Sequence, residues 1–133
     1  MIFVDSSVWI DFLRDLETPQ TKKLDSILGV EQVVVGDLVI AEVLQGCSDQ
    51  KIFGDTIKLF QRADFVVVAG YRVALQAARN YITLRAKGIS VRKTIDTLIA
   101  TRCILDDYEL LHNDRDFIPF EEHLGLRCVD VDT

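Results

Sequence analysis

The sequence has few of the features that mark membrane, secreted or thiolate-metal proteins. Only two prolines and seven glycines occur in 133 residues, which argues against a disordered or fibrous chain. No apolar run approaches the ~20 residues that span a bilayer, and the start lacks the basic stretch and cleavage site of a signal peptide. The three cysteines (Cys47, Cys103 and Cys128) cannot all pair and show no metal-binding spacing. We therefore expect a reduced, cytoplasmic protein without membrane association.

Positive charge is scarce overall but unevenly distributed along the chain. The 15 lysines and arginines are outnumbered by 21 acids, so the net charge is −6. That balance argues against broad, non-specific binding to nucleic acid. Residues 71–103 nevertheless hold seven basic side chains and one acid, a local charge of +6. A solvated helix face is the usual meaning of such a tract, and a contact with nucleic acid is the alternative.

Short apolar runs alternate with segments of helical spacing, and no hairpin signals separate them. The strand-like runs are residues 2–4, 33–35, 65–68, 108–112 and 126–129. The predicted helices cover residues 6–16, 20–28, 38–46 (after an Asp37 N-cap), 50–62, 71–87 and a segment that starts at 94. This alternation predicts a single α/β domain over residues 1–133, a three-layer α/β/α sandwich with a mostly parallel sheet of four to five strands.

Acidic side chains follow several of the predicted strands. Asp5 follows the first strand, where it either caps the next helix or stands at the strand's carboxyl end as a site residue. Glu42 lies in a predicted helix that is apolar nearly all round, and a buried carboxylate there needs a partner or a cation. Asp114 and Asp116 follow the fourth strand, and their spacing points both to one side if the segment is extended. Asp96 reaches the same edge only if the loop before it does.

These acids suggest a cation site, because the carboxyl ends of parallel strands share one edge of the sheet. Gathered carboxylates repel one another unless a cation neutralises them. Oxygen ligands without cysteine or well-spaced histidine favour Mg²⁺ or Mn²⁺ over zinc. Magnesium also accepts phosphate oxygens, so the chemistry that fits is phosphodiester hydrolysis by an activated water. His112 and His123 lack evident partners, and we expect both to be structural.

Four blocks of sequence carry a resemblance to a known family. They are Ile2–Asp11, Ile40–Gly46, Asp96–Ala100 and Leu110–Phe117. In order and spacing they resemble the PIN-domain ribonucleases, specifically the VapC-type toxins of toxin–antitoxin systems. The resemblance implies Mg²⁺-dependent endonucleolytic cleavage of RNA, with Mn²⁺ as a substitute. It also implies a homodimer that a VapB-like antitoxin neutralises, in a larger complex that reaches operator DNA through the antitoxin.

The resemblance also implies site residues. The catalytic, metal-binding acids would be Asp5, Glu42, Asp96 and Asp114, with Asp116 as an accessory metal ligand. Ser6 matches the small hydroxyl residue that often follows the family's first aspartate. Asn113 stands where the family commonly has threonine or serine, so a hydroxyl that positions water is missing there.

The basic tract gains a possible role from this placement. Arg85, Lys87, Arg92 and Lys93 flank the turn that leads into Asp96, and we expect them to neutralise RNA phosphates near the metal site.

Two other classes of protein with acidic sites need residues that this sequence lacks. A phosphorelay receiver domain needs a lysine after a late strand, and no lysine follows Lys93. A haloacid-dehalogenase-type phosphatase needs a second aspartate two residues after the first, where Ser7 stands. A catalytically degenerate PIN-like domain, which only binds RNA or an antitoxin, remains open as the alternative function.

Overall fold

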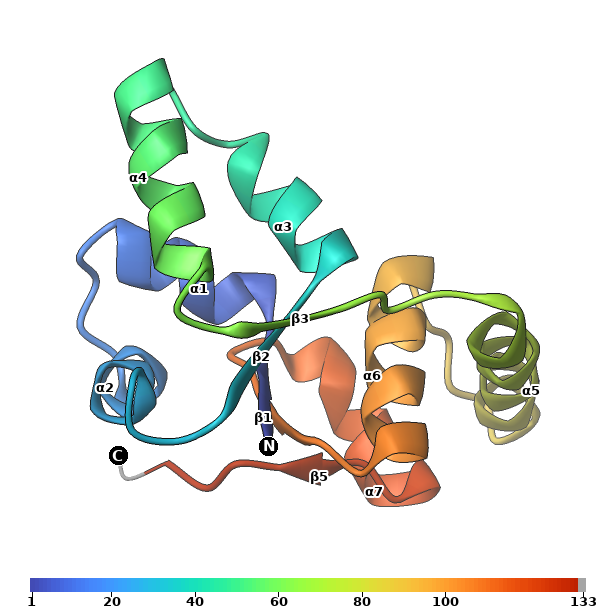
Figure 1. Ribbon diagram of the computed structural model, residues 1–133. Helices are drawn as coiled ribbons and strands as arrows, with labels where there is room; N and C mark the ends of the chain where they lie inside the picture. The colour runs from blue at the N-terminus through green and yellow to red at the C-terminus, as the bar shows by residue number, and fades with distance from the viewer. Residues whose placement is uncertain (132–133) are drawn as a thin grey trace.

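Five short strands form one parallel sheet in the computed structural model, which describes residues 1–131 (Figure 1). The strands are β1 (Ile2–Val4), β2 (Val33–Gly36), β3 (Asp64–Val66), β4 (Glu109–Leu111) and β5 (Arg127–Cys128). Their order across the sheet is β3-β2-β1-β4-β5, and every neighbouring pair is parallel. β1 and β2 are buried along their whole length, as expected for strands covered on both faces.

The helices cover the two faces of this sheet. They are α1 (Ser6–Leu13), α2 (Pro19–Ile27), α3 (Asp37–Leu44), α4 (Gln50–Phe60), α5 (Tyr71–Ala86), α6 (Thr94–Asp106) and α7 (Ile118–Leu124), with a 3₁₀ turn, η1 (Arg115–Phe117). Right-handed crossovers with this strand order put α1–α4 on one face and α5–α7 on the other, as Figure 1 shows. This confirms the predicted α/β/α sandwich. None of the described helices is both long and apolar enough to cross a bilayer.

The order of the strands reverses its direction at β1. The chain moves outward from β1 to β2 and β3, and then returns to place β4 on the other side of β1. In an open parallel sheet, such a reversal leaves a crevice outside the carboxyl ends of the two central strands. Here those ends belong to β1 and β4, so the residues after Val4 and Leu111 lie where this topology favours a ligand site.

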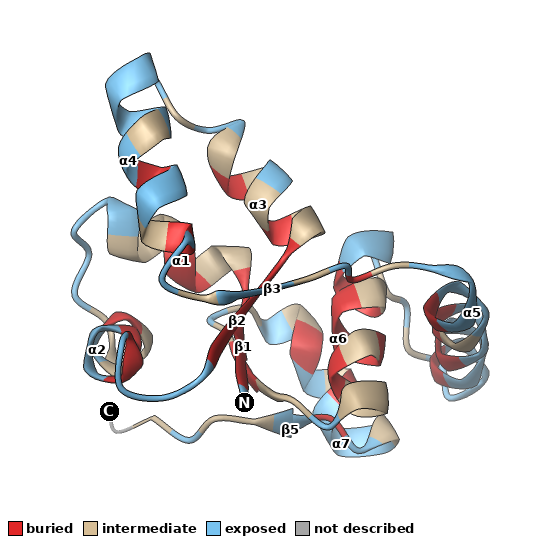
Figure 2. Cartoon of the chain, viewed as in Figure 1, coloured by how far each residue is buried: buried red, intermediate tan, exposed pale blue. Residues whose placement is uncertain are grey.

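The core lies between the sheet and its helices (Figure 2). The Trp9 side chain is fully buried and meets the ring of Phe60 edge to face, with ring centroids 5.1 Å apart. Gly36, where β2 passes into α3, has the least free space of the glycines. An added Cβ there would lie 2.3 Å from Val68 Cγ2 and 2.9 Å from Phe3 Cζ, so only glycine fits.

Two expectations about the third helix were wrong. Asp37 is the first residue of α3 rather than its N-cap, which is Gly36. Its carboxylate accepts the backbone N–H of Val68 at 2.7 Å and so ties α3 to the segment after β3. The helix is also not buried all round, because only Val39 and Val43 are buried. Apolar composition alone could not distinguish a buried helix from one whose outer apolar face meets solvent.

The region after β4 holds two elements that the sequence did not predict. η1 and α7 follow each other directly, with Phe117 and Phe120 buried beneath them. Together they are too short for helical spacing to stand out. Other boundaries moved by a few residues: α1 ends at Leu13 instead of residue 16, and β3 spans Asp64–Val66 instead of residues 65–68.

Candidate active site

The carboxylate of Asp5 lies at the carboxyl end of β1 and is only 3% exposed. Its Oδ2 accepts hydrogen bonds from the backbone N–H of Ser7 at 3.1 Å and from the Ser7 hydroxyl at 2.7 Å, so Asp5 caps α1. Burial raises the pKa of Asp5 against the opposing effect of these hydrogen bonds. The two roles considered for Asp5, a cap and a carboxylate at the sheet edge, therefore coexist in one position.

Ser7 also connects the two central strands. Its Oγ accepts the backbone N–H of Asn113, at 3.1 Å, from the loop that follows β4. The Asn113 side chain is exposed, so its recorded contribution is its main chain rather than its amide group. The sequence pattern predicted Ser6 as a site residue and did not predict this role of Ser7. A hydroxyl two residues after a helix-capping carboxylate is the local signal that could have identified it.

Glu42 reaches the same region from α3. The Ser6 hydroxyl donates to Glu42 Oε1 at 3.3 Å, which joins the start of α1 to the middle of α3. Burial, and then the charge of Asp5, raise the pKa of the half-buried Glu42 carboxyl. Ser6 and Ser7 thus each hold one carboxylate, Glu42 and Asp5 respectively.

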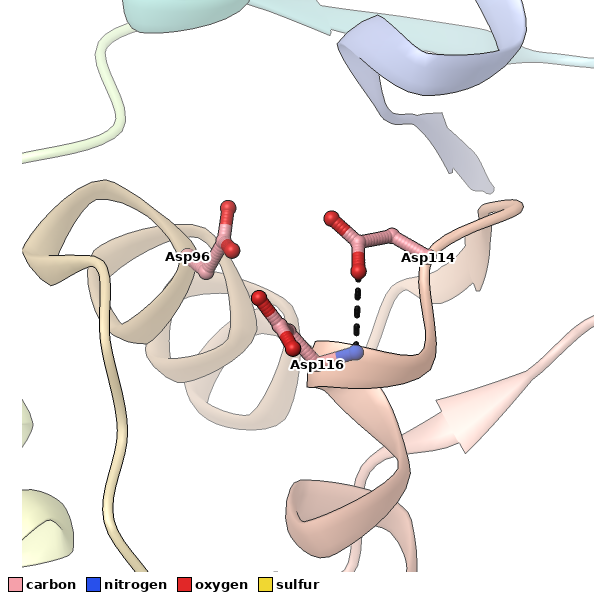
Figure 3. Close-up of side chains that lie close together, drawn as sticks. All are labelled: Asp96, Asp114 and Asp116. Carbon is pink, nitrogen blue, oxygen red and sulfur yellow. Dashed lines mark hydrogen bonds between the residues drawn. The ribbon is translucent and has the colours of Figure 1, made fainter.

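Three further carboxylates converge beside the first pair. Asp96, Asp114 and Asp116, which we call the acidic triple, each offer an oxygen such that these atoms lie within 4.8 Å of one another. Figure 3 shows them facing one another from the start of α6 and from the turn after β4. Asp114 Oδ1 accepts the backbone N–H of Asp116 at 2.9 Å, because Asp114 caps η1. The segment is therefore turned rather than extended, and the turn brings both carboxylates to the same side.

Asp96 is the most buried residue of the acidic triple. It is 5% exposed, and its Oδ2 is buried without a hydrogen-bond partner. Burial and the charge of Asp5, only partly offset by Lys93, raise the pKa of Asp96 from 3.8 to about 7, and Asp114 and Glu42 add to the rise. The other three sequence-predicted catalytic acids are therefore near enough to Asp96 to act on its ionisation.

Basic side chains approach the acidic triple from the loop between α5 and α6. Lys93 Nζ lies 3.5 Å from Asp114 Oδ2 and 3.9 Å from Asp96 Oδ2. The Arg92 guanidinium lies 3.3 Å from Asp116. Arg85, another of the predicted basic residues, instead lies over the ring of Tyr81 on α5, 5.6 Å from its centroid.

His112 supports the loop that carries these acids. Its Nδ1 accepts the backbone N–H of Asp114 at 3.1 Å, and its ring packs on Phe117 with centroids 5.0 Å apart. Burial lowers the pKa of His112, which favours the neutral ring that this hydrogen bond requires. These contacts match the structural role expected for this histidine.

The residues present fit a hard divalent cation. The donors are carboxylate oxygens alone, which suits Mg²⁺ or Mn²⁺. The unpartnered, buried Oδ2 of Asp96 is the kind of atom that a cation would satisfy. The raised pKa values of Asp5, Glu42 and Asp96 reflect negative charge that is buried in excess of its neutralisation. A positive ion at the acidic triple would relieve both features.

The sequence matches one known protein family over the region that holds this site. The sequence profile of the PIN domain family matches residues 2–122, which is most of the chain. Every acid and serine described above falls inside that match.

Solved structures of similar fold include DNA-bound VapBC complexes and a VapC toxin. VapBC2 of Rickettsia felis, bound to a DNA fragment from its promoter, matches with a TM-score of 0.74 and 18% identity, covering 99% of this chain and 100% of that one. DNA-bound VapBC of Salmonella typhimurium matches with a TM-score of 0.76 and 14% identity, covering 97% and 96%. VapC20 of Mycobacterium tuberculosis, a sarcin–ricin loop cleaving toxin, matches at 0.66 and 17%, covering 89% and 93%. At such identities the likeness establishes the fold.

Proposed function

The chain belongs to the PIN domain family, and from that premise we propose that it is a metal-dependent endoribonuclease acting as the toxin of a toxin–antitoxin pair. The observation that carries the proposal is the acidic triple beside Asp5 and Glu42, with the Asp96 oxygen buried and unpartnered. In this proposal residues 1–133 form one domain, since a single sheet takes strands from both ends of the chain.

The proposed division of labour follows the hydrogen bonds. Asp5, Glu42, Asp96 and Asp114 would hold the divalent ion, with Asp116 as an accessory ligand. Within this set the acidic triple already offers oxygens that lie within 4.8 Å of one another. When bound, Mg²⁺ or Mn²⁺ supplies the positive charge that activates water and stabilises the leaving oxygen. Ser7 and Ser6 keep the Asp5 and Glu42 carboxylates oriented. Their raised pKa values make these two carboxylates better proton acceptors than ordinary acidic side chains.

RNA is the proposed substrate, and the supporting feature is the basic tract near the acids. Arg85, Arg92 and Lys93 are exposed and lie at the end of α5 or in the loop before α6. On a protein of net charge −6 they would offset repulsion between the phosphates and the acidic surface. Two other members of the tract have structural duties instead: Arg72 pairs with Asp106, and Arg102 pairs with the same acid.

A groove between α1, α3 and α4 supports the proposed antitoxin. Ile10, Leu13, Val43 and Ile52 give it an apolar lining, and Glu42 is also among the residues that line it. A peptide seated there would therefore lie against one of the site's carboxylates. The similar VapBC structures contain a toxin with its antitoxin, and we propose a VapB-like partner, through which the complex would reach operator DNA.

Homodimerisation is proposed on the exposed face of α5. Tyr71, Leu75 and Ile82 share that face at helical spacing, with 82%, 42% and 53% of their surfaces exposed. Sedimentation of the purified chain should give twice the monomer mass, and Ile82→Glu should give a monomer. A monomeric wild-type chain at micromolar concentration would remove this part of the proposal.

RNA cleavage by the purified chain tests the function directly. We expect cleavage with Mg²⁺ or Mn²⁺ and none in excess EDTA. Asp96→Asn should lower the rate by more than about 100-fold, because it removes a charged ligand. Asp25→Asn, an identical change at an exposed position of α2, should cleave like wild type. Undiminished cleavage in EDTA, or by the Asp96 variant, would contradict the proposal.

A further inference from the structure

Two consecutive cations face the three carboxylates of the acidic triple. Arg92 lies 3.3 Å from both carboxylate oxygens of Asp116, and Lys93 approaches Asp114 at 3.5 Å and Asp96 at 3.9 Å. Every member of the triple thus has a positive group beside it. The Lys93 ammonium also faces the Oδ2 of Asp96, the same buried oxygen that no hydrogen bond satisfies.

The backbone explains why these two neighbouring residues contact different members of the acidic triple. Lys93 is the N-cap residue of α6 and is extended, with φ −123° and ψ 121°. Successive side chains of an extended segment point to opposite sides. The two side chains therefore leave the chain in different directions. Arg92 contacts Asp116, and Lys93 contacts Asp114 and Asp96.

These contacts look provisional in energetic terms. The Arg92 and Lys93 side chains are 76% and 56% exposed, and among the described residues neither forms an ion pair outside the triple. Exposed ion pairs stabilise a fold by no more than about 1 kcal/mol. The lysine also stays beyond hydrogen-bonding distance of the Asp96 oxygen. A cation that binds the carboxylates directly would replace such contacts readily.

We propose that Arg92 and Lys93 are internal counter-ions of the acidic triple, which a divalent cation must displace, and that Lys93 thereby sets the metal affinity of the site. This inference rests on the proposed function. It explains how three neighbouring carboxylates, one of them buried, are held together before the ion arrives. The displaced side chains then lie beside the ion, where their charge is available to an RNA phosphate.

The consequence is that removal of the lysine charge tightens metal binding. An ammonium within 4 Å of two ligating carboxylates competes with an incoming cation, and its loss should lower the dissociation constant by roughly three- to tenfold. Lys93→Arg keeps the charge and should bind as wild type does. Lys87→Met removes one charge from an exposed lysine that follows α5, and it reports the effect of net charge alone.

The experiment is Mn²⁺ binding to the full, metal-free chain, followed by calorimetry and by the electron paramagnetic resonance signal of free Mn²⁺. Wild type, Lys93→Met, Lys93→Arg and Lys87→Met are compared at one pH and ionic strength. Tighter binding by Lys93→Met alone would support the inference. Circular dichroism and urea unfolding of each variant verify that the compared proteins are folded.

Two kinds of negative result are distinguishable. If wild type binds Mn²⁺ and Lys93→Met binds it equally or more weakly, the inference is overturned while the proposed function stands. Equal tightening by Lys87→Met would also overturn it, because general charge would then suffice. If wild type binds no Mn²⁺ at any concentration, the proposed function itself fails.

Discussion

Replacement of Asp96 by asparagine should stabilise the metal-free protein at alkaline pH. The wild-type carboxylate is buried beside Asp5, and its pKa is raised from 3.8 to about 7. Between about pH 4 and pH 7 the folded protein therefore holds a proton on Asp96 that the unfolded chain has already lost. Asparagine has nearly the same shape and no charge to bury, so the change removes the penalty at its source.

The sign and size follow from linkage. Well below pH 3.8 the carboxyl is protonated in both states and contributes nothing. As the pH rises from about 4 to 7, the unfolded state loses the proton first, and the free energy of unfolding falls. Above pH 7 the penalty is complete. A shift from 3.8 to about 7 corresponds to about 4 kcal/mol at 1.36 kcal/mol per pKa unit.

The assay is urea unfolding in EDTA at pH 4 and pH 8. Asp96→Asn should exceed wild type by less than about 1 kcal/mol at pH 4, close to the unfolded pKa of 3.8, and by up to about 4 kcal/mol at pH 8, with an unchanged dependence on urea. Asp25→Asn, at an exposed position, should show no such pH-dependent difference. Saturating Mg²⁺ should stabilise wild type at pH 8 and the Asp96 variant much less, because the ion would neutralise the same charge.

The reasoning would be refuted by an Asp96 variant less stable than wild type at pH 8. It would also be refuted by a stability difference of the same size at both pH values. The first result would mean that the Asp96 carboxylate stabilises the fold through its contacts. The second would mean that the effect of the substitution does not come from buried charge.

Two further predictions concern positions at the carboxyl ends of β1 and β2. Ser7→Ala removes the hydroxyl that joins Asp5 to the Asn113 N–H, and we expect a loss of about 1–3 kcal/mol in urea unfolding. Ser7→Thr, which keeps the hydroxyl, should recover part of that loss. Gly36→Ala places a methyl group 2.3 Å from Val68 Cγ2, and it should cost about 1–3 kcal/mol by thermal unfolding; wild-type stability would show that the β2–α3 junction yields.

Much of the fold could be predicted because its signals are local. Buried strands of β-branched and aromatic residues recur between helical segments, and Pro19 begins α2 where a proline is tolerated. Errors fell where tertiary contacts prevail over local preference. Asp37 has the side chain of a helix cap, yet its carboxylate bonds to Val68, 31 residues away. The α7 region is held by Phe117 and Phe120 in the core rather than by its own periodicity.

The acids of the candidate site could be named from the sequence, because most of them follow a predicted strand or open a predicted helix, and Glu42 stands inside a helix that is otherwise apolar. Their grouping could not. Asp116, expected to be an accessory, lies in the tight triple because η1 turns the chain directly after Asp114. Asp5 and Glu42 are instead held by serine hydroxyls from the start of α1.

By itself the sequence determined the layered architecture, the kinds of side chain at the strand ends and the excess of acid over base. These depend on periodicity and composition, which are properties of neighbours along the chain. The tertiary structure alone decided that Ser7 bridges β1 to the loop after β4, and that Lys93 faces Asp114. Such contacts form between segments whose distance is set by the sheet order, so no local pattern encodes them.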